Sequence, residues 1–288
     1  MISNLIYDVG MHNGNDTGYY LHRGFKVIAI EANPVLCSQA KKRFSQQIEA
    51  GQLQILNIGI ASTASNRPFW ICEPISEWSS FDLAIASRDG SAHHAIDVPC
   101  QTFRWVLETY GVPHYLKIDI EGNDELCIDA LTTEDLPVYV SFEGGPNTKR
   151  VLPILDKLRR LKYTQFKCIS QINFLPLQYL PAKETTRYER WLRITSRKGE
   201  LARYMRKMFT LKILQRFLLP TMWDEDWQFP PGSSGPFGER GAGRWHTYDD
   251  IVNMYCRFVD LFSQGTPSPL WGIKDLCFWI DFHAKRTE

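Results

Sequence analysis

YDVGMHNGNDT, residues Tyr7–Thr17, directly follows a short apolar segment and contains an aspartate, two glycines and a run of small polar residues. An apolar segment that ends in a glycine-rich turn is typical of the first strand of a parallel sheet followed by a helix. Gly10 and Gly14 permit tight turns and let a ligand come close to the main chain. Because a carboxylate at Asp8 repels phosphate, the turn suits an amino-acid moiety better than a pyrophosphate. The stretch therefore predicts a cofactor-binding turn.

Further apolar segments alternate with helical patterns through the first half of the chain. Such alternation predicts βαβ units and a parallel sheet, hence an α/β fold. We expect strands at Leu5–Val9, Lys26–Glu31, Leu53–Ala61, Tyr115–Ile120 and Val138–Phe142.

The clearest helix follows the second strand. Asn33 is a good helix N-cap, and Pro34 suits the first turn, where its missing N–H costs nothing. Apolar residues then recur every four positions from Leu36 to Ile48, and Gly51 is expected to end this helix.

Two more strands are predicted beyond the first half, separated by a long insertion. A helix over about 148–161 leads into a sixth strand at Tyr163–Ser170, and the seventh is Leu276–Ala284. A connection of this length needs structure of its own. We therefore predict a sheet domain from residues 1–170 and 271–288. Residues 171–270 are predicted to be a helical and aromatic insert between strands six and seven, either a lid or a substrate-recognition region.

Composition excludes several classes of protein. The 33 Lys and Arg nearly balance the 32 Asp and Glu, so global charge does not favour a nucleic-acid partner. The seven cysteines are scattered and form no CxxC pair, which indicates a reducing, cytoplasmic setting. We expect no signal peptide, and no apolar run is long enough for a membrane span.

The end of the second strand carries another acid, Glu31, 17 positions after Gly14. That spacing fits one helix and one strand, so both residues are expected at the same edge of the sheet. An acid in this place typically accepts hydrogen bonds from the two ribose hydroxyls of an adenosine.

The segments DVGMHNG, IEANP, LNIGIAS and YLKIDIEGND, in this order and spacing, resemble the FkbM family of S-adenosylmethionine-dependent methyltransferases. The resemblance covers roughly Leu5 to Glu143, and KIDIEG is its most specific part. It implies a class I, Rossmann-like fold, in which a seven-stranded, mostly parallel sheet ends in an antiparallel strand. The late seventh strand agrees with this expectation.

The resemblance also implies the residues that bind S-adenosyl-L-methionine. They are Asp8, Gly10 and Gly14 around the methionine part, Glu31 at the ribose, Asn33, Asn57 and Gly59 near the adenine, and Asp119 and Glu121 toward the sulfonium. Asn13, in the same turn, is also among the predicted cofactor-binding residues. One departure from the family is Met11-His12, where the family usually has Ala-Asn. Two roles stay open for His12, which also belongs to the predicted set: a hydrogen bond to the cofactor carboxylate, or simple packing.

A hydroxyl acceptor needs a base to remove its proton. Glu121 and Glu143 follow the fourth and fifth strands and are the candidates, together with Asp119, which lies closer to the cofactor. These three carboxylates could instead hold a divalent cation. The resemblance implies no required metal, so we predict none.

The function predicted from these residues is O-methylation of a hydroxyl on a sugar, polysaccharide or related secondary metabolite. A nicotinamide-dependent oxidoreductase is the alternative enzyme, although the GxGxxG spacing is missing. A non-catalytic protein that binds S-adenosylmethionine is the third possibility.

The insert is expected to bind the acceptor, a small molecule or a glycan. Residues 183–216 contain eleven basic and three acidic side chains. They predict an amphipathic helix that contacts anionic lipid or a phosphorylated carrier, or else a solvated helix face. Five of the nine tryptophans lie at positions 191, 223, 227, 245 and 271. They suit sugar rings, or a small core of the insert.

Overall fold

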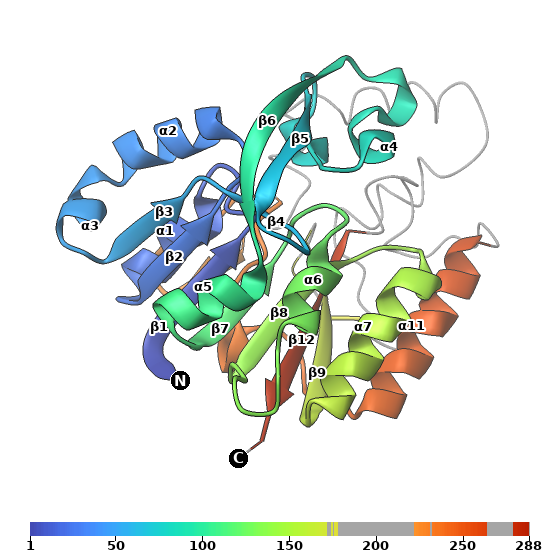
Figure 1. Ribbon diagram of the computed structural model, residues 1–288. Helices are drawn as coiled ribbons and strands as arrows, with labels where there is room; N and C mark the ends of the chain where they lie inside the picture. The colour runs from blue at the N-terminus through green and yellow to red at the C-terminus, as the bar shows by residue number, and fades with distance from the viewer. Residues whose placement is uncertain (172–173, 175, 178–221, 231, 264–278, 288) are drawn as a thin grey trace. The chain divides into compact units, whose positions relative to one another are not determined.

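The computed structural model describes residues 1–171, 174, 176–177, 222–230, 232–263 and 279–287 (Figure 1). The chain divides into two compact units. The first comprises Met1–Phe142, Asp156–Tyr163 and Ala284–Glu288, and the second comprises Glu143–Leu155 and Thr164–His283. Residues 178–221, most of the first half of the predicted insert, lie outside the described residues, so the predicted boundary at residue 170 stays a prediction.

Seven strands form the main sheet, in the order β3-β2-β1-β7-β8-β12-β9. They are β1 (Ile2–Val9), β2 (Lys26–Ile30), β3 (Leu53–Leu56), β7 (Pro113–Ile118), β8 (Tyr139–Gly144), β9 (Tyr163–Ser170) and β12 (Ile280–Arg286). β1 pairs in parallel with β2 and β7, and Asp8 stands opposite both Ala29 and Lys117. The carboxyl ends of these three strands therefore meet at one edge of the sheet.

The last strand runs against its neighbour. The backbone N–H of Arg286, at the end of β12, donates to the carbonyl of Val138, just before β8 begins, at 3.0 Å. This orientation makes β12 antiparallel to β8. The α/β fold with a seven-stranded, mostly parallel sheet is thus confirmed. Of the predicted seventh strand, residues 276–278 lie outside the described part of the chain.

The helices that follow the first two strands are α1 (Asn15–His22), α2 (Pro34–Arg43) and α3 (Ser45–Glu49). Asn33 caps α2 as predicted, because its Oδ1 accepts the N–H of Val35 at 2.9 Å. The single helix predicted as far as Gly51 is wrong in one respect, since the chain bends between α2 and α3 at Phe44. The Phe44 ring is buried against Gly14, which gives the bend its packing contact.

The predicted strand 53–61 is also wrong, because it breaks after Leu56. The Asn57 side-chain amide donates to the carbonyls of Glu31 and Ala32, at 2.9 and 3.0 Å. These bonds occupy backbone groups at the end of β2, so the chain leaves the main sheet here. Residues Gly59–Ile60 form β4, which pairs with β6 in a separate three-stranded sheet.

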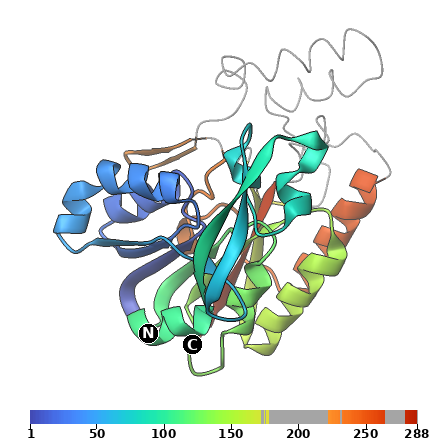
Figure 2. The same ribbon diagram turned by 45° about the horizontal axis from the view of Figure 1, so that its top comes forward.

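The three-stranded sheet belongs to a projecting segment that we did not predict from the sequence. We call residues 65–101 the arm: β5 (Ser65–Cys72), the short helices η1 (Ser76–Trp78), α4 (Leu83–Ala86) and η2 (Arg88–Gly90), and β6 (His93–Gln101). β5 and β6 are antiparallel over their full length. In both views the arm is a twisted ribbon with α4 beside its upper part, above the main sheet in Figure 1 (Figures 1 and 2).

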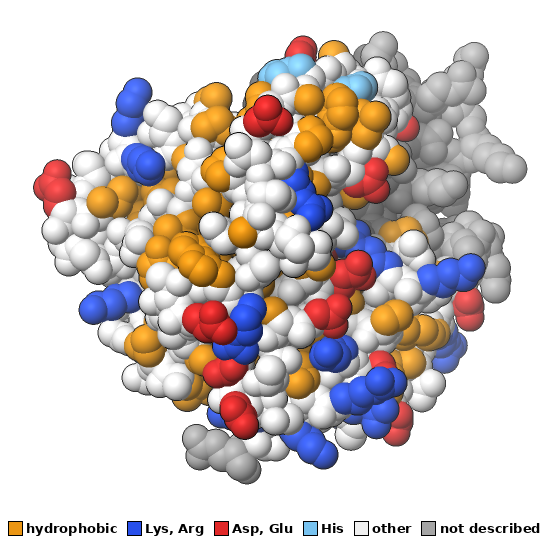
Figure 3. Space-filling view, in the orientation of Figure 1, with side chains coloured by type: hydrophobic (Ala, Val, Ile, Leu, Met, Phe, Trp, Pro, Cys, Tyr) orange, Lys and Arg blue, Asp and Glu red, His pale blue; other side chains and the backbone are white. Residues whose placement is uncertain are grey.

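Aromatic packing stabilises the arm and its contact with β4. Phe69 and Phe81 pack edge to face with centroids 4.9 Å apart, and a Cβ on Gly59 would lie only 2.2 Å from the Phe81 ring. Figure 3 shows hydrophobic side chains gathered over the upper part of the arm, beside histidines. Leu83 of α4 is 42% exposed.

After the arm, the chain continues through α5 (Phe103–Tyr110), β7, α6 (Asp124–Asp129) and α7 (Thr148–Arg160). The helix predicted over about 148–161 and the strand at Tyr163–Ser170 are confirmed.

The second unit contains β9, the hairpin β10 (Met222–Asp224) and β11 (Trp227–Phe229), η3 (Gly238–Arg240) and α11 (Tyr248–Ser263). Thr247 caps α11, because its Oγ1 accepts the backbone N–H of Asp250 at 3.2 Å. The Thr247 hydroxyl in turn donates to the Asp250 carboxylate at 2.9 Å. The basic residues 183–216 lie outside the described chain. Among the residues that are described, no helix is long and apolar enough to cross a membrane.

Candidate functional site

The glycine turn after β1 is fixed between the ends of β2 and β7. The backbone N–H groups of Gly10 and Met11 both donate to the carbonyl of Ile30, at 2.9 and 3.0 Å. Gly10 has φ +86°, and a Cβ there would lie 1.7 Å from the carbonyl oxygen of Asp119. Only glycine allows the two strand ends to come this close.

Glu31 lies at the end of β2, next to this turn. One carboxylate oxygen accepts the backbone N–H of Asn33 and the other accepts that of His12, both at 2.8 Å. Burial raises the pKa of Glu31 to about 7, although the two backbone hydrogen bonds oppose that shift. Each oxygen can still accept another hydrogen bond. The group is therefore suited to a pair of neighbouring hydroxyls.

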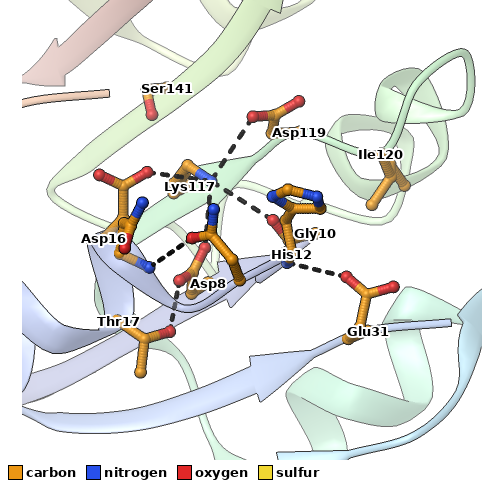
Figure 4. A network of polar contacts seen from close by, with 12 residues as sticks. Asp8, Gly10, His12, Asp16, Thr17, Glu31, Lys117, Asp119, Ile120 and Ser141 are labelled. Carbon is orange, nitrogen blue, oxygen red and sulfur yellow. Dashed lines mark hydrogen bonds and ion pairs between the residues drawn. The ribbon is translucent and has the colours of Figure 1, made fainter. Parts of the chain in front are cut away.

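Lys117, the next-to-last residue of β7, is the centre of a buried charge cluster (Figure 4). Its Nζ lies 3.2 Å from Asp8 Oδ1, 3.5 Å from Asp16 Oδ2 and 3.6 Å from Asp119 Oδ2. It also donates to the carbonyl of Gly10 at 3.4 Å. One ammonium group thus connects β1, the glycine turn, the first turn of α1 and the end of β7.

The acids of this cluster differ in exposure. Asp8 is fully buried, and its other oxygen accepts the hydroxyl of Thr17 at 2.6 Å. The Asp119 side chain is 29% exposed. Asp8 is therefore part of the buried packing below the turn, whereas the Asp119 carboxylate is partly accessible to solvent at the edge of the sheet.

The loop after β7 holds Glu121 in an unusual conformation. Glu121 has φ +42°, and its carbonyl accepts the hydroxyl of the buried Ser80 in the arm at 2.7 Å. Its carboxylate lies 3.5 Å from the guanidinium of Arg88, another arm residue. A Cβ on the next residue, Gly122, would lie 3.0 Å from Ile85 of α4. The arm therefore shapes the loop that carries a predicted catalytic residue.

His12 is a second contact between the turn and the arm. It has φ +51°, and its Nε2 lies 2.7 Å from the hydroxyl of Ser76. Burial lowers the pKa of His12, whereas the negative charges of Glu77 and Asp119 oppose this effect. The imidazole thus packs against the arm. A hydrogen bond from His12 to the cofactor carboxylate stays a prediction.

The other predicted cofactor residues have local structural roles. Gly14 is the N-cap of α1 with φ +76°, and Asn13 Oδ1 accepts the N–H of Asn15 at 3.0 Å. Asn33, Asn57 and Gly59 end or begin elements, as described above. These roles explain the residues locally, and their contacts with a cofactor stay predictions.

Glu143 is half-buried in β8 and belongs to the second unit. Its role as a candidate base at the sheet edge stays a prediction. Within the described ranges, no group of three His, Cys, Asp or Glu side chains could hold a metal ion.

Several residues of the site were missed by the sequence analysis. Ser76, Ser80 and Arg88 belong to the unpredicted arm, and no motif marks them. Lys117 did carry a signal, because a lysine within the apolar strand YLKIDI must be buried and therefore needs acidic partners.

One family of known proteins matches a large part of this chain. Residues 8–164 match the methyltransferase FkbM domain. A search among curated proteins finds no match to this chain.

Among solved structures, the chain is similar to methyltransferase FkbM from Methylobacillus flagellatus, at 15% identity over 49% of this chain and 32% of that chain, with a TM-score of 0.34. It is also similar to Haemonchus contortus phosphoethanolamine N-methyltransferase 2, in complex with phosphomonomethylethanolamine and S-adenosylhomocysteine. There the identity is 8% over 99% of this chain and 49% of that chain, with a TM-score of 0.38. The chain thus spans half or less of the length of either protein. The domain match covers more than half of the present sequence, so the chain belongs to the FkbM family of S-adenosylmethionine-dependent methyltransferases.

Proposed function

We propose that this protein transfers a methyl group from S-adenosylmethionine to a hydroxyl of a sugar, polysaccharide or secondary metabolite. The observation that carries the proposal is the edge of the main sheet. There the Gly10 turn, the Glu31 carboxylate and the partly exposed Asp119 lie at the ends of three adjacent strands.

The residues at this edge fit the cofactor. Glu31 is held by two backbone N–H groups and retains acceptor capacity for the two ribose hydroxyls. Asp119 offers a carboxylate toward a cationic group. When bound, S-adenosylmethionine supplies a methyl group that its positive sulfur has already activated for transfer. The protein then needs to hold and align the acceptor.

A hydroxyl acceptor must also lose its proton, and Glu121 is the candidate that receives it. Its carboxylate is mostly buried, at 17% exposure, and the Arg88 guanidinium at 3.5 Å favours the charged, proton-accepting form. The hydroxyl of Ser80 holds the backbone of Glu121 in place. A positioned base typically contributes about a hundredfold to ten-thousandfold in rate.

The acceptor class is supported by exposed aromatic surface in the second unit. Trp223, in the hairpin of β10 and β11, has 54% of its surface exposed, which is unusual for so large an apolar side chain. Indole faces suit sugar rings, and this favours a glycan among the possible acceptors. The basic region 183–216 remains our candidate for contact with anionic lipid or a phosphorylated carrier.

The cofactor is tested by titration calorimetry with S-adenosylhomocysteine, and with NAD as a parallel control. We expect saturable one-to-one binding of S-adenosylhomocysteine alone. Binding of NAD alone would instead favour the oxidoreductase.

The acceptor is tested by incubating the protein with S-adenosylmethionine and a panel of glycans, hydroxylated metabolites and amines. Formation of S-adenosylhomocysteine is measured, and the methylated atom is located by mass spectrometry. We expect turnover with a hydroxyl acceptor, and a loss of about a hundredfold or more in Glu121→Gln. Glu125→Gln, on the exposed side of α6, is the matched control and should keep full activity. Turnover with amines alone would refute the O-methylation proposal.

A further inference from the structure

We propose that Lys117 sets how strongly the cofactor site prefers S-adenosylmethionine to S-adenosylhomocysteine. Lys117 thereby acts as a specificity-determining residue through its buried charge. This inference rests on the proposed function, because it takes the edge beside Asp119 as the place of the cofactor's sulfur.

The argument begins with the charges around Lys117. Asp8, Asp16 and Asp119 all lie within 3.6 Å of Nζ. Three ionised carboxylates and one ammonium group leave an excess of two negative charges. The Lys117 side chain is only 4% exposed. Solvent therefore screens this cluster far less than it would screen a surface pair.

The two forms of the cofactor differ by one positive charge. S-adenosylmethionine carries a sulfonium, and its sulfur becomes neutral when the methyl group leaves with the acceptor. A negative site favours the charged form, and every positive charge added nearby reduces that preference. Lys117 offsets one of three carboxylates, so it is expected to weaken the preference for S-adenosylmethionine without abolishing it.

The position of the ammonium strengthens this reasoning. Lys117 Nζ contacts the carbonyl of Gly10 in the turn as well as the carboxylate of Asp119, both of which lie at the predicted methionine end of the cofactor. Its charge therefore acts next to the region where the charge of the ligand changes. A lysine with a purely structural role would affect both forms of the cofactor equally.

The experiment compares dissociation constants for S-adenosylmethionine and S-adenosylhomocysteine by calorimetry, in the wild type and four variants. Lys117→Met removes the positive charge, and Lys117→Arg retains it. Asp16→Asn removes one negative charge from the first turn of α1 and leaves both glycines of the turn in place. The double variant Asp8→Asn with Lys117→Met removes one charge of each sign.

We expect Lys117→Met to increase the preference for S-adenosylmethionine by about fivefold to tenfold, the effect of one unit charge in a partly screened site. Asp16→Asn should decrease it by a similar factor. Lys117→Arg and the double variant should keep the wild-type ratio, even where both affinities fall.

If Lys117→Met does not fold, Asp16→Asn and the double variant still decide the question. Either of two results would overturn the inference. One is an unchanged ratio of the two dissociation constants in Asp16→Asn. The other is a change of this ratio by about fivefold to tenfold in the double variant, the change expected for a single charge. A wild type that binds neither ligand would overturn the proposed function, and this inference with it. A wild type that binds both, with the same ratio in all variants, would overturn the inference alone.

Discussion

Replacing Gly10 with alanine should destabilise the protein more than the same change at Gly24, although both glycines have nearly the same positive φ angle. Their φ angles are +86° and +83°. A Cβ at position 10 would lie 1.7 Å from the carbonyl oxygen of Asp119, whereas a Cβ at position 24 would have nothing within 4 Å. The pair therefore separates the cost of the backbone conformation from the cost of the close contact.

The magnitudes follow from these two costs. A left-handed conformation costs a residue other than glycine about 1 to 2 kcal/mol, and this applies at both positions. Forcing an extra carbon into a filled space adds about 1 to 3 kcal/mol. Gly24→Ala should therefore lose about 1 to 2 kcal/mol of unfolding free energy, and Gly10→Ala about 2 to 5 kcal/mol.

Urea unfolding followed by circular dichroism measures this difference, with free energies extrapolated linearly to water. Calorimetry with S-adenosylhomocysteine adds a functional measurement. Gly10→Ala should weaken binding, because it pushes the turn away from the end of β7, and Gly24→Ala should not. Equal losses of unfolding free energy in the two variants would show that the contact with Asp119 relaxes without cost, and the reasoning would fail.

Four further predictions follow from the same region. The pKa of Glu31 rises from 4.5 to about 7 on folding, so between those pH values the folded protein binds more protons than the unfolded chain. The stability that this group contributes must therefore fall as the pH rises through that window. Urea unfolding at several pH values should show this decrease of the unfolding free energy with pH in the wild type, and its loss in Glu31→Gln. Because the charged carboxylate is the better acceptor, affinity for S-adenosylhomocysteine should rise with pH up to about 7 in the wild type and much less in Glu31→Gln. Asn33→Ala should lose about 0.5 to 2 kcal/mol of unfolding free energy, the usual value of a helix cap, and a loss near zero would mean that α2 does not depend on it. Ser80→Ala should lose about 1 to 3 kcal/mol of unfolding free energy, because the Glu121 carbonyl loses its buried hydrogen-bond donor. The same variant should exchange its backbone amide hydrogens faster in residues 120–124. Unchanged exchange would refute the role of the arm in holding this loop.

The main sheet could be predicted from sequence because its inner strands are continuous apolar runs. Residues Leu5–Val9 of β1, Val27–Ile30 of β2 and Tyr115–Ile118 of β7 are all buried, so each strand appears in the sequence as a largely apolar run. The acid at the end of β2 was identified for the same reason, since it follows a clear strand and helix. The breaks at Phe44 and Asn57 were missed because side-chain contacts from distant residues cause them.

The arm could not be predicted, because its strands are largely exposed. β5 and β6 mix polar and apolar residues and contain a proline each, at Pro68 and Pro99, so neither reads as a strand by itself. Their pairing, together with contacts such as that between Ser80 and Glu121, becomes visible only in three dimensions. The burial of Lys117 could be inferred from the sequence, but its three acidic partners come from β1, from α1 and from the loop after β7.

The Asn13-Gly14 pair in the turn has a consequence for the chemical ageing of the protein. Asparagine followed by glycine is prone to deamidation, in which the glycine nitrogen attacks the side-chain amide carbon, ammonia leaves, and water then opens the cyclic imide to a carboxylate. In the folded protein the Gly14 N–H is bonded to the carbonyl of Met11 at 3.0 Å, and Asn13 Oδ1 is held by the N–H of Asn15. Folding should therefore protect this pair, and partly unfolded stocks should accumulate a more acidic form whose added negative charge lies in the cofactor turn.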